Sequence, residues 1–286
     1  MIRPFCLARV NQFSVIFTIF IFITGPGLPS VDIVLAETRD PNEKKEMTDL
    51  DLLYQSSQLK FHSKNYKEAL PLLFEYIQKN IEQNNKRERL LWVMDQIGMI
   101  YLRVLKRPED AVAFFNRMGK DKRLNEAEEN TVQEWLGAAQ DWAKRNPDIE
   151  KLDRESLFLN GKKYFQDGLK LSKKPDNENG NGYFHISANY LIPFIRNHDS
   201  DPRIGEALLM LGTVKSFTHH DMDFWSENFY LKEVIRRFPH SVEAKKSFER
   251  LEQEIHFGYS GSGGDHTPPS VLTMLERYRE LATPEK

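Results

Sequence analysis

The amino-acid sequence predicts an all-α protein built from antiparallel helix pairs. Apolar residues recur at helical spacing from Leu50 almost to the end of the chain, as in amphipathic helices that bury one face. No stretch alternates apolar and polar residues for more than a few positions, which a half-buried strand requires. Small residues also recur three positions before aromatic ones, and a small residue lets two helices cross closely. These observations together predict ten or eleven helices.

The first element in the chain is a predicted export signal. Residues 13–23 read FSVIFTIFIFI without a charge and follow two arginines, which is the pattern of a secretory signal peptide. We expect cleavage after Ala36, followed by a charged, flexible lead-in over residues 37–49. The alternative is an uncleaved membrane anchor over residues 13–24. This apolar run, however, is shorter than the roughly 20 residues that span a bilayer.

The helical domain is expected over residues 50–257. Pro108 begins a helix at a position that tolerates its missing N–H. The longest breaker, KKPDNENGNG at 173–182, predicts a solvated loop. A loop rich in glycine, serine and proline at 258–270 precedes the last helix and tail, 271–286. We expect helices near residues 50–61, 66–77, 91–102, 108–118, 132–145, 156–172, 183–196, 204–217, 224–238, 241–257 and 271–282.

The composition excludes several classes of protein. With 40 Lys and Arg against 42 Asp and Glu, the chain lacks the basic excess of nucleic-acid-binding proteins. The single cysteine, Cys6, lies before the apolar run, so we expect no thiol in the mature chain. Disulfides, thiol nucleophiles and cysteine metal sites are then excluded.

A weak internal repeat runs through the helical domain. Its core is a small residue followed three positions later by an aromatic one, as in Gly98-x-x-Tyr101 and Gly161-x-x-Tyr164. The other residues that fit the repeat are Ser57, Phe61, Asn65, Tyr66, Ala69, Ala111, Gly168, Ala188, Gly212 and Phe238-Pro239-His240.

These residues resemble the tetratricopeptide repeat (TPR), a helix pair whose copies stack into a right-handed α-α superhelix. The resemblance covers residues 50–255, and insertions at 125–145 and 173–182 account for spacings longer than the 34-residue repeat. Residues 230–251 are similar to repeats of exported bacterial proteins of the cell-division coordinator and outer-membrane assembly type. The resemblance implies a periplasmic TPR-like scaffold that mediates protein–protein interaction in the bacterial cell envelope.

In this family the first helices of successive pairs line a groove that binds a peptide or a partner helix. Aromatic and methionine side chains suit such a groove because they offer large contact areas. In the alternative interpretation, the aromatic residues of the set pack in the core between repeats. By resemblance, the groove candidates are Tyr54, Gln58, Phe61, Trp92, Asp95, Met99, Arg103, Phe158, Lys162 and Phe165.

The remaining motifs predict no catalytic or metal site. His219-His220-Asp221 places adjacent histidines on different sides of a helix, so we expect no bound metal. Residues 257–270, FGYSGSGGDHTPPS, lack the motifs of a phosphate loop and of a nucleophile elbow. They predict a turn or a contact loop for a partner. Glu126, Glu128 and Glu129 predict a solvated acidic face.

We therefore expect a non-enzymatic scaffold without cofactor or metal, whose partner is a protein or a peptide. We expect no binding to nucleic acid, and membrane association only through the N-terminal segment. One alternative is an enzyme, or an enzyme accessory, with a site near residues 257–270 where His266 meets a carboxylate. The other is an envelope assembly factor anchored in the membrane by residues 13–24.

Overall fold

The computed structural model describes residues 48–84, 87–145, 148–172, 180–218, 228–262 and 264–283. All of them belong to one compact unit, Met47–Lys286. Several predictions lie outside the described residues: the signal peptide, the lead-in up to residue 47, the His219-His220-Asp221 motif and most of the 173–182 loop.

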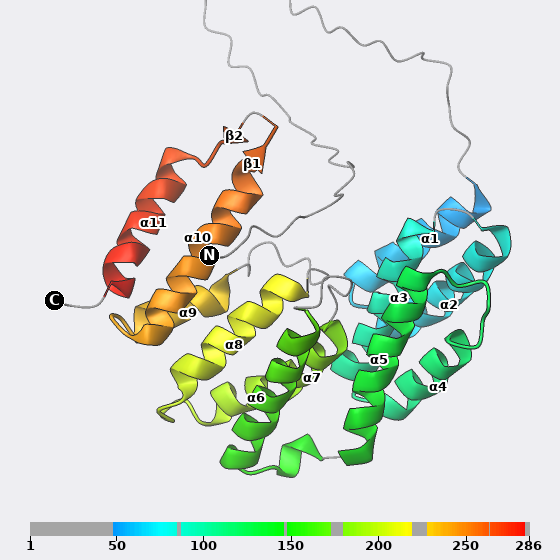
Figure 1. The fold of residues 1–286 in the computed structure, drawn as a ribbon, viewed down its shortest axis with the longest axis horizontal. Coiled ribbons are helices and arrows are strands. Elements are labelled where there is room, and N and C mark those ends of the chain that lie inside the picture. Colours follow the sequence, from blue (N-terminus) through cyan, green and yellow to red (C-terminus); the bar gives the residue numbers. More distant parts are fainter. Residues whose placement is uncertain are drawn as a thin grey trace, which may run out of the picture. The chain divides into compact units, whose positions relative to one another are not determined.

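The described residues form eleven α-helices and a hairpin of two short strands, so the all-α prediction is confirmed (Figure 1). The predicted helix at 91–102 is in fact an α-helix continued by a π-helix, η1 (Ile100–Val104). A short 3₁₀-helix, η2 (Ile149–Lys151), precedes α6, and the hairpin strands are β1 (Ser260–Gly261) and β2 (Gly264–Asp265). The α-helices are α1 (Asp49–His62), α2 (Tyr66–Gln83), α3 (Glu88–Met99), α4 (Pro108–Met118), α5 (Glu126–Arg145), α6 (Arg154–Leu171), α7 (Asn181–Asn197), α8 (Ile204–Phe217), α9 (Phe229–Arg237), α10 (Val242–Tyr259) and α11 (Pro269–Ala282).

Most helices that follow one another in the sequence pack together, and so do several helices two places apart. α6 packs on α7, α7 on α8, α8 on α9 and α9 on α10. In addition α3 contacts α5, α6 contacts α8, and α8 contacts α10. This pattern is that of helices stacked side by side along the chain.

The small residues noted in the sequence lie where helices approach closely. A Cβ atom on Gly98 of α3 would lie 2.3 Å from the Trp135 ring of α5. One on Gly161 of α6 would lie 2.6 Å from Leu191 of α7. A larger residue at either position would therefore push the helices apart. Gly168 and Gly212 are enclosed in the same way.

Two hydrophobic clusters form the core of the described residues. The larger one extends from α1 to α9, and the smaller one joins α9, α10 and α11. Leu209 of α8 packs against both clusters. Because α8 contacts both α6 and α10, it holds these two helices on either side of itself.

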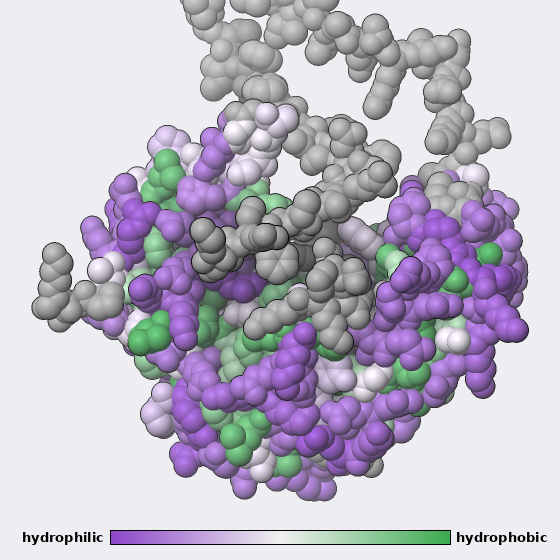
Figure 2. All heavy atoms as spheres, in the orientation of Figure 1, coloured by the Kyte–Doolittle hydropathy of each residue, from purple (hydrophilic) through white to green (hydrophobic). Residues whose placement is uncertain are grey.

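Hydrophilic residues cover much of the face shown in Figure 2, and hydrophobic residues lie in patches between them. None of the described helices is both long enough and apolar enough to span a bilayer.

Candidate functional site

The candidate residues of α1 take part in contacts with α3 and α2. The side-chain amides of Gln58 and Gln96 donate to each other, with N–O distances of 2.9 and 2.7 Å. The guanidinium of Arg89 lies 4.6 Å from the centre of the Tyr54 ring, and the Tyr76 ring packs beside Tyr54. Gln58 and Tyr54 therefore join neighbouring helices.

Three of the candidates are core residues. Phe61, Met99 and Phe158 are each 3% exposed. Phe158 packs against Phe194 and beneath the guanidinium of Arg203, which lies 4.5 Å from its ring centre. So little exposed surface offers nothing to a partner, and for these residues the core interpretation replaces the groove interpretation.

Three further candidates, on α3 and η1, differ in their surroundings. Trp92 is 58% exposed. Asp95 accepts a hydrogen bond of 2.6 Å from the indole Nε1 of Trp135. Arg103 donates to the side-chain oxygen of Asn189 on α7 at 2.7 Å. Trp92 alone of the three presents a large surface to solvent.

The π-helix explains the position of Asn189, which is 1% exposed. A π-helical turn contains one residue more than an α-helical turn, so it disturbs the regular pairing of carbonyl oxygens with N–H groups along the helix. The Asn189 amide donates to the main-chain oxygen of Leu102, within η1, at 2.8 Å. Asn189 therefore satisfies a backbone acceptor in η1 and is held by Arg103 at the same time.

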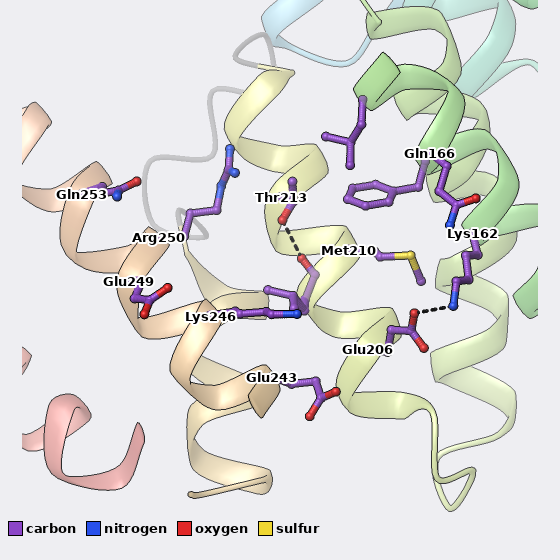
Figure 3. Close-up of a pocket in the computed structure, with 13 residues that line it drawn as sticks. Lys162, Gln166, Glu206, Met210, Thr213, Glu243, Lys246, Glu249, Arg250 and Gln253 are labelled. Atoms are coloured by element: carbon purple, nitrogen blue, oxygen red, sulfur yellow. Dashed lines mark hydrogen bonds and ion pairs between the residues drawn. The ribbon is translucent and has the colours of Figure 1, made fainter. Parts of the chain in front are cut away.

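The last two candidates, Lys162 and Phe165, lie in a groove between α6, α8 and α10 (Figure 3). The groove has a volume of about 530 Å³, within the range of protein sites that hold small ligands or anchoring side chains. It is lined by Lys162, Phe165, Gln166, Leu169, Glu206, Leu209, Met210, Thr213, Glu243, Lys246, Glu249, Arg250 and Gln253.

The groove residues of each helix lie on one helical face. On α6 and α8 they follow the spacing i, i+3, i+4, i+7, starting from Lys162 and from Glu206. In both helices the first residue is charged and apolar residues follow, among them Phe165, Leu209 and Met210. The residues that α10 contributes are all charged or amide side chains. All the apolar side chains of the groove therefore come from α6 and α8, interspersed with polar ones such as Gln166 and Thr213, whereas the α10 side is entirely polar.

Some of the charges in the groove are already paired. Lys162 forms an ion pair of 2.8 Å with Glu206. Arg250 donates to Glu254 at 3.0 Å and to Ser216 at 2.8 Å. Burial lowers the pKa of the Arg250 guanidinium, and Glu254 opposes that effect. Arg250 is therefore held in the wall by neighbours that do not line the groove.

The sequence prediction does not include the α8 and α10 residues of this groove, because its candidates all come from the first three repeat copies. The signal was present in the sequence. Glu206, Leu209, Met210 and Thr213 repeat the spacing of the α6 face. Which of several amphipathic faces stays open, however, depends on contacts between distant helices.

A buried polar cluster joins α3, α5 and α7 away from the groove residues. Glu134 is 6% exposed, and its Oε1 accepts a 2.9 Å hydrogen bond from the N–H of Gly182, in the first turn of α7. Its Oε2 is buried and has no hydrogen-bond partner among the described residues. Burial, with help from Asp95, raises the pKa of Glu134 to about 8. The adjacent Trp135 stacks on His185, so this cluster holds three helices together.

The predicted acidic face at the start of α5 is wrong for Glu128. This side chain is buried and pairs with Arg87. Its Oε2 accepts from the N–H of Asn125, while the Asn125 side chain accepts from the N–H of Glu128, at 2.9 and 3.0 Å. This reciprocal arrangement is a capping box. Glu126 and Glu129 are exposed, as predicted.

The loop at 258–270 contains the hairpin, and its residues Asp265 and Thr267 form a polar cluster with His256 of α10. The Nδ1 of His256 lies 2.6 Å from Oδ2 of Asp265, and the Thr267 hydroxyl donates to Asp265 at 2.5 Å. The hydrogen bonds from Thr267, with His256, lower the pKa of Asp265. The Ser260 hydroxyl donates to the main-chain oxygen of His256 and so is not directed at the imidazole. His266, expected to meet a carboxylate in the enzyme alternative, is exposed, and the polar groups gather around His256 instead.

Among the described residues, no group of three or more His, Cys, Asp or Glu side chains is arranged to hold a metal ion. Searches with protein-family models, among curated proteins and among solved structures give no match to this chain.

Proposed function

We propose that this protein is an exported, TPR-like scaffold that binds a protein partner in the groove between α6, α8 and α10. It acts without a cofactor and is not an enzyme. The observation that carries the proposal is the open groove, whose walls come from equivalent faces of three alternate helices. In a helical-repeat array such faces form a continuous surface for an extended partner.

Three features of the groove support protein recognition. Phe165 and Leu209, both half-buried, supply apolar contact area, which provides most of the energy in protein interfaces. Gln166 and Gln253 supply exposed amides that both donate and accept hydrogen bonds. The walls lie on helices rather than loops, so the contact surface is already formed before a partner binds.

The proposed location is the bacterial periplasm, reached after cleavage of the signal peptide at Ala36. The apolar run preceded by two arginines supports export. The similarity of residues 230–251 to repeats of exported bacterial proteins supports the cell envelope.

Photo-crosslinking in living cells tests the proposal. A photoreactive amino acid replaces Gln166 or Gln253 in the groove, and Glu276, exposed on α11, serves as the control position. We expect both groove positions to give the same protein adduct, and Glu276 to give none of it. Equal adducts from all three positions, or no adduct from the groove, would count against the proposal.

A further inference from the structure

We infer that the partner segment in the groove is amphipathic and basic: an apolar side chain seated on α6 and α8, next to a lysine or arginine that faces α10. The inference rests on the proposed function and specifies the chemistry of the partner. Two observations support it. The apolar side chains of the groove come from α6 and α8 while α10 contributes only polar ones, and some charged side chains on α10 have no ion-pair partner among the described residues.

The apolar side of the groove selects an apolar anchor. Phe165 and Leu169 of α6 and Leu209 and Met210 of α8 form it. Met210 is 4% exposed and forms the floor of this side. Phe165, Leu169 and Leu209 are half-buried, so these three side chains retain surface that a ligand can cover. Covering such surface is favourable at roughly 25 cal/mol per Å². An apolar side chain is the natural occupant of this side.

The polar side of the groove carries an excess of unpaired negative charge. Glu243 and Glu249 of α10 form no ion pair with any described residue, and neither does Lys246. The other charged residues of the groove are paired, Lys162 with Glu206 and Arg250 with Glu254. The lining residues carry as many acidic as basic side chains, but Arg250 is paired with Glu254 from outside the groove. Two carboxylates and one ammonium group therefore lack an ion-pair partner among the described residues, which leaves an unpaired charge of −1 for a ligand to neutralise.

The spacing on α10 places these charges along the length of the groove. Glu243, Lys246 and Glu249 follow one another at intervals of three residues, so they lie on one face of the helix. Figure 3 shows all three on the α10 side, across from Met210. A basic side chain next to an apolar anchor can therefore reach a carboxylate while the anchor contacts α8.

Three labelled peptides test the inference by fluorescence anisotropy with the purified protein. Their sequences are Gly-Leu-Lys-Phe-Lys-Gly, the same peptide with Gln in place of Lys, and the same peptide with Glu in place of Lys. We expect affinity to fall in that order, and to be lost when Ser replaces both Leu and Phe. The preference for the basic peptide should shrink as salt is added, because the carboxylates are partly solvated.

Two charge variants locate the effect. The double variant Glu243→Gln with Glu249→Gln is expected to weaken the basic peptide on the order of 3- to 10-fold, the scale of partly exposed charge pairs, and to leave the neutral peptide unchanged. The matched control, Glu276→Gln with Glu280→Gln on exposed positions of α11, removes the same charge and is expected to have no effect.

The outcomes separate this inference from the proposed function. Tighter binding of the acidic or neutral peptide overturns the inference but leaves a groove that binds peptides. Equal loss of affinity in the α10 and α11 variants also overturns it, because net charge alone would then explain the preference. If none of the peptides binds, the inferred chemistry is wrong, and crosslinking from Gln166 and Gln253 decides the proposed function separately.

Discussion

Replacing Glu134 by Gln should stabilise the protein, and by more as the pH rises. The substitution keeps the shape of the side chain and an oxygen that can accept from Gly182, but it removes the ability to ionise. In the folded protein the pKa of Glu134 is raised from 4.5 to about 8. The folded state therefore holds a proton that the unfolded state releases, so Glu134 makes folding progressively less favourable as the pH rises from about 4.5 to about 8.

The magnitude follows from the pKa shift. Each pH unit well between the two pKa values costs about 1.4 kcal/mol. Because the dependence flattens close to each pKa, the stability of the Gln variant relative to wild type should increase by about 3.5 kcal/mol between pH 5 and pH 8. Comparing two pH values removes constant terms, such as the cost of any unpaired amide hydrogen in the variant. Urea unfolding of both proteins, followed by circular dichroism across this range, measures the change. A difference that stays constant with pH would refute the reasoning.

The matched control is Glu128→Gln in the same helix. Here the carboxylate is paired with Arg87 and completes the capping box with Asn125. In the Gln variant the largely buried guanidinium of Arg87 faces a neutral amide in place of a carboxylate. We expect this substitution to destabilise the protein by about 1 to 3 kcal/mol. If both substitutions change stability in the same direction, the environment of the two carboxylates is not what distinguishes them.

Further variants test the packing and the N-terminus. Gly98→Ala should lower the free energy of unfolding by about 1 to 3 kcal/mol, because the new Cβ would collide with the Trp135 ring. In Gly137→Ala the new Cβ would lie 3.7 Å from its nearest atom. This second substitution should therefore stabilise the helix by about 0.5 to 1 kcal/mol. Opposite signs in thermal unfolding are the expected result. Asn189→Ala should lower the free energy of unfolding by about 1 to 3 kcal/mol, because the Leu102 carbonyl of the π-helix loses its hydrogen-bond donor. Unchanged stability in urea unfolding would contradict this role of Asn189. Mass spectrometry of the secreted protein should find a chain that begins directly after Ala36, and an intact first residue would contradict cleavage.

Helical periodicity sufficed to predict most of the α-helices, because each buries one face and so repeats every three to four residues. The same pattern located Gly98 and Gly161 at close helix contacts. It did not reveal the π-helix at Ile100–Val104, since the apolar spacing continues through Leu102. The hydrogen bond that pairs the Leu102 carbonyl of this π-helix comes from Asn189 of α7, 87 residues later in the chain.

The buried carboxylates show why charge patterns alone mislead. Glu126, Glu128 and Glu129 look alike in the sequence, yet Glu128 is buried because Arg87, 41 positions earlier, lies against it. The charge and apolar patterns do not predict the groove for a related reason. Lys162 and Phe165 belong to it, but Phe61, Met99 and Phe158 occupy the core, and only the packing of α6, α8 and α10 decides which faces remain open.

The assignment of the groove between α6, α8 and α10 as the binding site is tested most directly by filling the groove. The measurement is the affinity of the filled variant for the partner that crosslinking identifies. Gln166 is exposed at the groove wall, so Gln166→Trp adds bulk there without disturbing the core. Isothermal titration calorimetry should show at least a tenfold loss of affinity for this variant and an unchanged affinity for Glu276→Trp on α11. Equal affinities for both variants and the wild type would contradict the assignment of the groove as the binding site.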